Sequence, residues 1–270
     1  AILFIGILLP LTLAWTPPQS ATILQGTSDS VNWISVKTDS GTVHAPVAVP
    51  KGKGPFPAII ILHGTHGFAE EYIQLARHFA AKGFVGIAAC WFAGRKGVGE
   101  SIITPIEFKD APPFIDVAGT NRFRIARNSI DSIVRKVTTL SYVQKNHIAL
   151  MGHSRGAGAS LDYVLTHPGN VQAVILNSSG YPPEVTKRAP EVDVPILILH
   201  GTADNPADGG SSITNIEMAR QFEAALRKAN KQVDTKYYEG SGHNNLFIDS
   251  TQLNDTVQRI SAFLRDILFK

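Results

Sequence analysis

Short apolar runs alternate with stretches of helical periodicity along most of this chain. Residues 58–62 are uniformly apolar, and residues 84–89 are apolar apart from one glycine. This pattern is typical of strands that are buried on both faces of a sheet. Further strands are predicted at 147–151, 171–176, 194–199 and 233–238. We therefore expect a sheet in which most strands lie in the interior.

Helical periodicity follows most of these runs. Within residues 121–142 the apolar positions Ile130, Ile133, Val134 and Val137 fall on one face of a helix. Helices are also predicted at 68–82, 154–166, 216–229 and 257–268. Consecutive strands joined by helical crossovers pair in parallel. The sequence thus predicts an α/β fold in which helices flank a mostly parallel sheet.

Four segments lie outside this alternation. Residues 31–37 and 43–49 flank a turn signal and predict an antiparallel hairpin before the first parallel strand. Residues 91–120 lack periodicity, and a loop of that length is usually functional or mobile. Residues 178–193 connect two strands and number only 16, which leaves no room for a large cap domain.

Residues 1–21 carry no charge, and the first 15 of them are almost wholly apolar. This stretch is short for a membrane-spanning helix, which needs about 20 apolar residues, and Gly6 and Pro10 interrupt it. We expect a secretory signal with cleavage near Ala21 and export to the periplasm or the extracellular space. An uncleaved membrane anchor and a buried N-terminal arm are the alternatives. Residues 22–270 then form one domain, which we expect not to insert stably into a membrane.

Composition narrows the classes of function. Of the 270 residues, 44% are hydrophobic and 17% charged, as in ordinary globular proteins. The formal charge is +3, without a cluster of Lys and Arg that would favour nucleic acid as a partner. Cys90 is the only cysteine, which excludes an intrachain disulfide and a cysteine-based zinc site. No clustered ligands point to a metal.

A candidate nucleophile lies between a predicted strand and a predicted helix. Residues 152–156 read G-H-S-R-G, with Ser154 at the centre. Gly152 and Gly156 supply the room that a sharp strand-to-helix turn needs, because a β-carbon at either position would crowd the crossing backbone. Ser154 is then exposed at the tip of the turn, and the N–H of Arg155 is expected to point to a developing oxyanion.

A nucleophilic serine needs a base and an acid that orients the base. In this type of fold the chain order is Ser, then Asp or Glu, then His. Asp204 follows the strand at 194–199, and His243 follows the strand at 233–238 within a glycine-rich loop. Asp208 is the rival to Asp204, but Asp204 lies closer to the strand end and is preferred. These residues predict a Ser154–His243–Asp204 triad.

A second turn can complete the site. Residues 63–67, H-G-T-H-G, follow the strand at 58–62 directly. Such a turn can direct a backbone N–H at the same oxyanion. Thr65 is the preferred donor and His66 the second choice. His63 and His153 are expected to have structural roles, and Cys90 is expected to be a small buried apolar residue.

With these motifs in this order, the chain from about residue 31 onward resembles the dienelactone-hydrolase-like branch of the α/β-hydrolase superfamily. The resemblance rests on G-H-S-R-G at 152–156, L-H-G-T-A-D at 199–204, G-S-G-H at 240–243 and H-G-T-H-G at 63–67. It implies an eight-stranded sheet flanked by helices and hydrolysis through an acyl-enzyme, with no metal or organic cofactor.

Two positions depart from the pattern of this family. Dienelactone hydrolases use a cysteine nucleophile where Ser154 stands. They also carry a glutamate in the turn after the third strand, where the nearest match here is Gly64. We therefore expect hydrolysis of a small-molecule carboxylic ester rather than lactone-specific chemistry.

The residues that contact the substrate are less well defined by the sequence. Related lactone hydrolases bind a substrate carboxylate with an arginine at a place like that of Arg95, and a solvated loop arginine is the alternative. His66 is a second candidate for substrate contact. Trp91 and Tyr181 are expected to line an open, partly apolar pocket. Further candidates for the same pocket are Phe92, Phe108 and Phe114.

Two other functions compete with the esterase. Peptidases with prolyl-oligopeptidase-type catalytic domains share these motifs, but they usually carry an accessory domain, for which this chain has no room. A non-catalytic binding protein could keep the fold, although the intact Ser, Asp and His argue against it. The sequence leaves the oligomeric state open.

Overall fold

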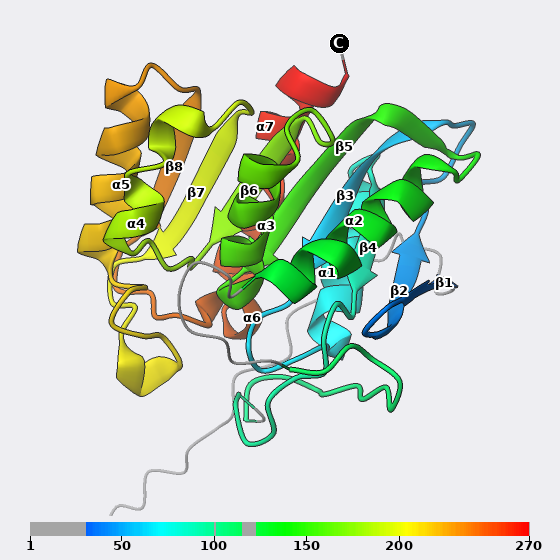
Figure 1. The fold of residues 1–270 in the computed structure, drawn as a ribbon, viewed down its shortest axis with the longest axis horizontal. Helices are drawn as coiled ribbons and strands as arrows, with labels where there is room; N and C mark the ends of the chain where they lie inside the picture. The colour runs from blue at the N-terminus through cyan, green and yellow to red at the C-terminus, as the bar shows by residue number, and fades with distance from the viewer. Residues whose placement is uncertain (1–30, 100, 115–122, 270) are drawn as a thin grey trace, which may run out of the picture.

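In the computed structural model, residues 31–99, 101–114 and 123–269 are described. The predicted signal segment, residues 1–21, lies outside them, so its role stays a prediction. The described residues form one sheet with helices on both faces (Figure 1). The eight strands follow the order β1 (Asn32–Thr38), β2 (Gly41–Ala48), β4 (Val85–Ala89), β3 (Phe56–Leu62), β5 (Val143–His153), β6 (Ala173–Asn177), β7 (Ile196–Gly201) and β8 (Val233–Tyr238).

The first two strands are the antiparallel part of the sheet. β1 pairs with β2 in the predicted hairpin, and β2 pairs antiparallel with β4. All pairs from β4 through β3 to β8 are parallel. The predicted α/β-hydrolase architecture, an eight-stranded and mostly parallel sheet, is therefore confirmed.

Helices cover the two faces of the sheet in two groups. One group packs on the first face and comprises α2 (Arg124–Thr138), α3 (Arg155–Thr166), α4 (Pro183–Thr186) and α5 (Ile216–Lys228). The other group packs on the second face and comprises α1 (Glu70–Ala81), α6 (Asn245–Ile248) and α7 (Ser250–Leu268). Two short 3₁₀ helices, Ala189–Glu191 and Pro206–Asp208, lie in the connections.

Strand β3 explains why the central strands are apolar without alternation. Its residues Ala58, Ile60 and Leu62 point into the core below α2 and α3. Its residues Ile59 and Ile61 point into the core below α1 and α7. Both faces of the strand are thus removed from water, which requires an apolar residue at every position.

Three elements have a boundary that differs from the prediction by four residues or more. Strand β5 begins at Val143 instead of residue 147, because Val143 pairs with Phe56 of β3. Helix α2 is shorter than predicted and ends at Thr138. Helix α7 begins at Ser250 instead of residue 257, since the Asp249 carboxylate accepts hydrogen bonds from two N–H groups of its first turn.

The described part of the long 91–120 loop is fixed to the hairpin. The backbone N–H of Thr42 donates to the carbonyl of Asp110 at 2.7 Å. The Asp110 carboxylate lies 2.9 Å from Nε2 of His44, and Phe108 stacks on the His44 ring at 4.4 Å. This loop therefore has defined contacts over its described residues, although it has no helical or strand periodicity.

Residues 178–193 contain only α4 and one 3₁₀ helix, which agrees with the prediction that no large cap domain is inserted there. Among the described residues, no helix combines the length and the apolar character that a membrane crossing requires.

Candidate active site

The turn from β5 into α3 has the predicted geometry. Ser154 stands between them with φ 53° and ψ −116°, and α3 begins at the next residue. A β-carbon on Gly152 would lie 2.2 Å from the backbone nitrogen of Ala157, and one on Gly156 would lie 2.2 Å from the carbonyl oxygen of Leu62. Only glycine fits at these two positions. The positive φ of Ser154 is a strained conformation of the kind that concentrates at functional sites.

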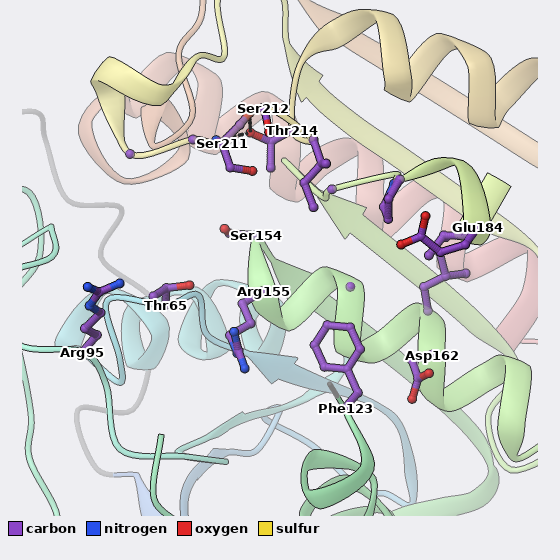
Figure 2. Close-up of a pocket in the computed structure, with 18 of the residues that line it drawn as sticks. Thr65, Arg95, Phe123, Ser154, Arg155, Asp162, Glu184, Ser211, Ser212 and Thr214 are labelled. Carbon is purple, nitrogen blue, oxygen red and sulfur yellow. Dashed lines mark hydrogen bonds between the residues drawn. The ribbon is translucent and has the colours of Figure 1, made fainter. Parts of the chain in front are cut away.

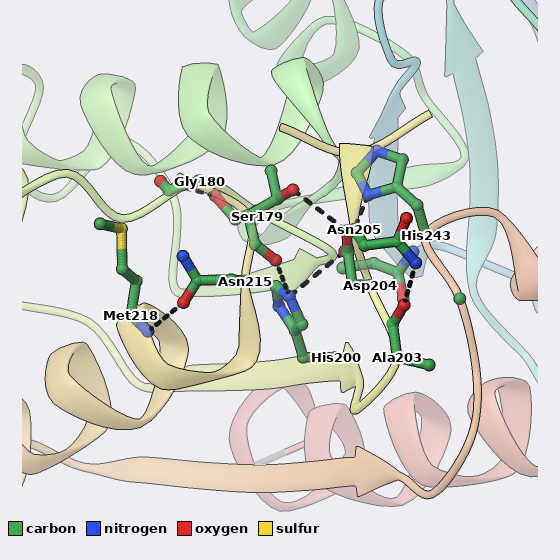
Figure 3. A network of polar contacts seen from close by, with 12 residues as sticks. Ser179, Gly180, His200, Ala203, Asp204, Asn205, Asn215, Met218 and His243 are labelled. Carbon is green, nitrogen blue, oxygen red and sulfur yellow. Dashed lines mark hydrogen bonds and ion pairs between the residues drawn. The ribbon is translucent and has the colours of Figure 1, made fainter. Parts of the chain in front are cut away.

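Asp204 and His243 form the predicted pair. Nδ1 of His243 lies 2.8 Å from Oδ2 of Asp204 (Figure 3). Nε2 of His200 lies 3.3 Å from the same oxygen, and the Thr214 hydroxyl donates to Oδ1 at 3.0 Å. The Asp204 side chain is thus held on both oxygens. It can orient the His243 ring, as the acid of a triad must.

The rival carboxylate, Asp208, holds the same loop in another way. Its two oxygens accept hydrogen bonds from the backbone N–H of His243 at 2.8 and 3.1 Å. The structure therefore brings Asp204, and not Asp208, to the imidazole ring. A third contact anchors the loop to the C-terminal helix, because the Ser241 hydroxyl donates to Oε1 of Gln252 in α7 at 2.7 Å.

Asp204 is buried but remains ionised. Burial on its own would raise the pKa of the Asp204 carboxyl, but hydrogen bonds from His200 and His243 outweigh burial and hold the pKa below its usual range. A carboxylate in this state stabilises positive charge on the imidazole that it contacts.

Two cavities meet at Ser154. The larger has a volume of about 650 Å³ and is lined by Arg95, Arg155 and residues of α3 and α4 (Figure 2). The smaller has a volume of about 310 Å³ and is lined by His66 and His243. Thr65 and Ser154 line both cavities. The structure thus brings the predicted nucleophile, base and oxyanion turn to one place.

The expected oxyanion donors flank Ser154. Within the described residues, the backbone N–H of Thr65 has no hydrogen-bond acceptor, while its carbonyl accepts from the N–H of Arg95 at 3.0 Å. The backbone N–H of Gly64, in contrast, donates to the Tyr72 hydroxyl at 3.0 Å. Thr65 rather than Gly64 is therefore placed to contribute an N–H to an oxyanion, together with Arg155 after the nucleophile.

The two predicted arginines line the larger cavity. Figure 2 shows Arg95 beside Thr65, and Arg155 directly after Ser154. The Arg155 guanidinium lies over the ring of Phe114 at 4.7 Å and near that of Phe92 at 5.8 Å. These aromatic rings limit the orientations of Arg155 and place a positive charge close to the cavity.

The structure does not bring Trp91 and Tyr181 to either cavity. Trp91 is 2% exposed, and its Nε1 donates to the carbonyl of His63 at 3.1 Å. Tyr181 is 1% exposed and stacks on Phe222 at 4.8 Å. Both rings pack in the core, so as they lie they offer no surface to a substrate. Phe123, which the sequence placed in a helix, lines the larger cavity instead.

Three buried histidines surround the site. His63 donates from Nδ1 to the carbonyl of Gly64 at 2.9 Å. His153 connects the end of β6 to the loop before α6, because its Nδ1 lies 2.8 Å from Nδ2 of Asn177 and its Nε2 lies 3.2 Å from Oδ1 of Asn244. His66 lies 2.7 Å from the Tyr72 hydroxyl through Nε2. The expected structural roles of His63 and His153 agree with these contacts.

Burial keeps these rings neutral. It lowers the pKa of His63 to about 3. It lowers the pKa of His66 to about 4, with a further contribution from His243. The pKa of His153 is well below its ordinary value, first through burial and then through the nearby His243 and His66. These three imidazole rings are therefore uncharged at neutral pH.

These shifts predict a loss of stability in mild acid. Each folded pKa lies below the unfolded value of about 6.5, so the unfolded chain binds more protons as the pH falls below 6.5. Stability that is present above pH 6.5 is lost progressively towards the folded pKa. We expect His63 and His66 each to cost about 2 kcal/mol of unfolding free energy at pH 5 relative to pH 7, and the lowered pKa of His153 acts in the same direction. Urea unfolding at the two pH values measures the sum.

A single substitution separates this effect from general acid unfolding. In His63→Gln, the difference in unfolding free energy between pH 7 and pH 5 should shrink by about 2 kcal/mol, because one titrating group is gone. An unchanged difference would show that His63 does not contribute to the acid sensitivity.

Two positions bear on the family's cysteine chemistry. Cys90 is 2% exposed at the end of β4, and burial raises the pKa of its thiol to about 12. A thiol in this state is a poor nucleophile. A β-carbon on Gly64 would lie 3.3 Å from Cβ of Ser154 and 3.1 Å from the His153 ring. Gly64 therefore stands next to the nucleophile, in tight surroundings.

Several supporting residues could not be identified from the sequence. Asp208, Thr214, Asn177 and Asn244 fix the triad loops through hydrogen bonds described above. Only Asp208 had a sequence signal, since it lies in the same short loop as Asp204. Across the described part of the chain, no group of three or more His, Cys, Asp or Glu is arranged to hold a metal ion.

Several known proteins resemble this chain in sequence or in fold. Mouse (Mus musculus) acyl-coenzyme A thioesterase 5 is 28% identical over 165 residues, which are 61% of this chain. The chain spans 34% of the length of that relative. Among solved structures, dienelactone hydrolase from Anabaena variabilis has a TM-score of 0.63 at 16% identity, covering 88% of this chain and 98% of that one.

A further structure, the dienelactone hydrolase-like promiscuous phosphotriesterase P91 from metagenomic libraries, has a TM-score of 0.67 at 15% identity, over 88% of this chain and 98% of that one. Identities this low show the shared fold. The family model named Dienelactone hydrolase family matches residues 43–257, which include all three residues of the candidate triad. The chain therefore belongs to the dienelactone hydrolase family.

Proposed function

We propose that the protein is a serine hydrolase that cleaves carboxylic esters through an acyl-enzyme on Ser154. One observation carries this proposal: the hydrogen-bonded pair Asp204–His243, 2.8 Å apart, opens on the cavity that Ser154 lines from its strained turn. Membership of a hydrolase family supports the class of reaction. The geometry favours the serine, because Cys90 is buried elsewhere with a raised pKa.

The proposed reaction has two half-reactions that use the same groups, and His243 acts in each first as a base and then as an acid. Ser154 Oγ attacks the ester carbonyl carbon while Nε2 of His243 takes its proton, and Asp204 stabilises the imidazolium that forms. Backbone N–H groups of Arg155 and Thr65 bind the oxyanion. His243 then protonates the leaving alcohol. In the second half-reaction, water attacks the acyl-enzyme with the same help and releases the acid.

The two cavities suggest which half of the ester lies where. His243 must reach the leaving oxygen in order to protonate it, and His243 lines only the smaller cavity. We therefore assign the alcohol half to the smaller cavity and the acyl half to the larger one. The acyl cavity combines apolar side chains such as Phe123 and Leu161 with the arginines Arg95 and Arg155. An acyl group that is both bulky and amphipathic fits this lining.

Covalent labelling tests the proposed nucleophile directly. A fluorophosphonate probe should label the wild-type protein, and peptide mapping should locate the label on Ser154. No labelling, or a label on another serine, would overturn the proposal.

A substrate panel tests the reaction class and the cavity assignment together. The panel contains p-nitrophenyl esters of graded acyl length, a thioester, a lactone and proline-containing peptides. Cleavage of esters with no cleavage of peptides is expected, and the reverse would favour a peptidase. Two isomeric esters, butyl hexanoate and hexyl butanoate, test the assignment, because the ester with the longer acyl half should have the higher kcat/KM.

A further inference from the structure

The hydroxyl of Tyr72 lies beneath the oxyanion turn and contacts it twice. Tyr72 is 1% exposed in helix α1. The backbone N–H of Gly64 donates to this hydroxyl at 3.0 Å, and Nε2 of His66 lies 2.7 Å from it. Gly64 and His66 flank Thr65, so a single oxygen holds the turn on both sides of the expected oxyanion donor.

The count of hydrogens on these groups decides the protonation of His66. A tyrosine hydroxyl carries one hydrogen and can also accept. Since Gly64 N–H donates to Tyr72, the hydroxyl hydrogen needs an acceptor. Among the described residues, the acceptor within reach is Nε2 of His66. Nε2 must then be without a hydrogen, and a neutral imidazole carries its hydrogen on the other nitrogen, Nδ1.

The His66 ring is uncharged at neutral pH, because burial and the neighbouring His243 lower the pKa of His66 to about 4. Nδ1 of His66 faces the loop at Gly99, since a β-carbon placed on Gly99 would lie 3.5 Å from this nitrogen. Within the described residues, Nδ1 has no hydrogen-bond partner, and the ring lines the smaller cavity together with Ser154 and His243.

We propose that Tyr72 fixes His66 as the Nδ1–H tautomer, and that His66 thereby presents a neutral N–H donor to the leaving-group half of the substrate. The tautomer of His66 is independent of the proposed function, whereas the role of His66 as a donor to the leaving group rests on it. His66 keeps its proton throughout and stabilises negative charge that develops on the leaving oxygen. Tyr72 is a positioning residue, since it acts on the substrate only through His66 and the turn.

Nitrogen NMR tests the first half on the resting protein. Two-bond ¹H–¹⁵N correlation spectra distinguish the two neutral tautomers of a histidine, and His66 is assigned by the signal that is lost in His66→Gln. The wild-type spectrum should show protonated Nδ1 and bare Nε2. In Tyr72→Phe the ring should move towards a mixture of tautomers. Protonated Nε2 in the wild type would overturn the proposal.

Tyr163→Phe is the matched control for Tyr72→Phe. Tyr163 is also a buried tyrosine whose hydroxyl makes two hydrogen bonds, to Asp131 and Asn170, and it lies outside the site on α3. This substitution should leave the His66 signals unchanged. If Tyr163→Phe also changes the His66 tautomer, the change comes from a general loss of packing in the protein. That result would contradict the positioning role of Tyr72.

Amide substitutions test the second half, because asparagine places an N–H close to the position of Nδ1 and glutamine places its amide near Nε2. For alkyl esters, which are poor leaving groups, His66→Gln should lower kcat about 10- to 100-fold, with a smaller loss for His66→Asn. For p-nitrophenyl esters, which have a good leaving group, the loss of kcat should be small in both variants. Equal losses for the two variants, or no loss in either, would overturn the role of the donor.

The two experiments separate this inference from the proposed function. If fluorophosphonate labelling of Ser154 fails while the NMR spectrum shows the Nδ1–H tautomer, the esterase proposal is wrong and the Tyr72–His66 arrangement stands. If labelling succeeds and the spectrum shows protonated Nε2, the esterase stands and this inference is wrong.

Discussion

Replacing Ser154 by alanine is expected to lower kcat/KM for a carboxylic ester by about four to six orders of magnitude. In the proposed mechanism the substitution removes the atom that forms the covalent bond, so His243 and Asp204 are left with no nucleophile to activate. Residual hydrolysis of about 10³-fold over water would come from the oxyanion donors and substrate binding alone. Steady-state kinetics with a p-nitrophenyl ester measures the loss.

The control for this variant is Ser129→Ala. Ser129 is a buried serine of α2 whose hydroxyl has no hydrogen-bond partner among the described residues. Its removal should leave kcat/KM unchanged. Activity of Ser154→Ala within tenfold of the wild type, with the contaminating host esterases excluded, would contradict the assigned nucleophile.

The substitution Gly156→Ala is expected to remove most of the stability of the fold. A β-carbon at this position would lie 2.2 Å from the carbonyl oxygen of Leu62 and 2.7 Å from that of His63. These are backbone atoms at the end of the central strand β3, so they cannot move away without displacing the strand and the turn after it. We expect a loss of more than about 4 kcal/mol in unfolding free energy, measured by urea unfolding.

Gly158→Ala, in the same helix, is the matched control. A β-carbon there would meet only the ring of Phe123, at 3.1 Å, and a side chain can turn aside. Alanine also favours a helix over glycine by about 1 kcal/mol. The control should therefore stay close to the wild type in stability. A Gly156→Ala protein that unfolds within 1 kcal/mol of the wild type would show that the turn tolerates a side chain.

The sequence predicted the triad because its signals are local. Ser154 lies at the junction of a predicted strand and a predicted helix, and Asp204 and His243 each come five residues after the end of a predicted strand. Parallel strands bring their carboxyl ends to one edge of a sheet. The need for glycine at Gly152 and Gly156 could also be predicted from the sequence, since a sharp turn between a strand and a helix leaves no room for a β-carbon.

The partners of the triad could not be predicted in this way. Tyr72 lies on a helix, where an aromatic residue reads as core, and its contact with the turn depends on how α1 packs. For Trp91 and Tyr181 the sequence prediction was wrong in the other direction, because it assigned two core residues to the substrate pocket. Both lie in segments next to the site, but the path of each loop turns their rings into the core, and periodicity says nothing about the direction of a loop side chain.

The hydrogen bond between Ser241 and Gln252 has a consequence for the order in which the protein becomes active. His243 and the helix that anchors its loop are made about 90 residues after Ser154. A chain that is still being synthesised can form the turn around Ser154, because β5 and α3 are complete, but it has no base. Under the proposed mechanism, Ser154 is therefore not activated until the chain has been made through His243 and Gln252.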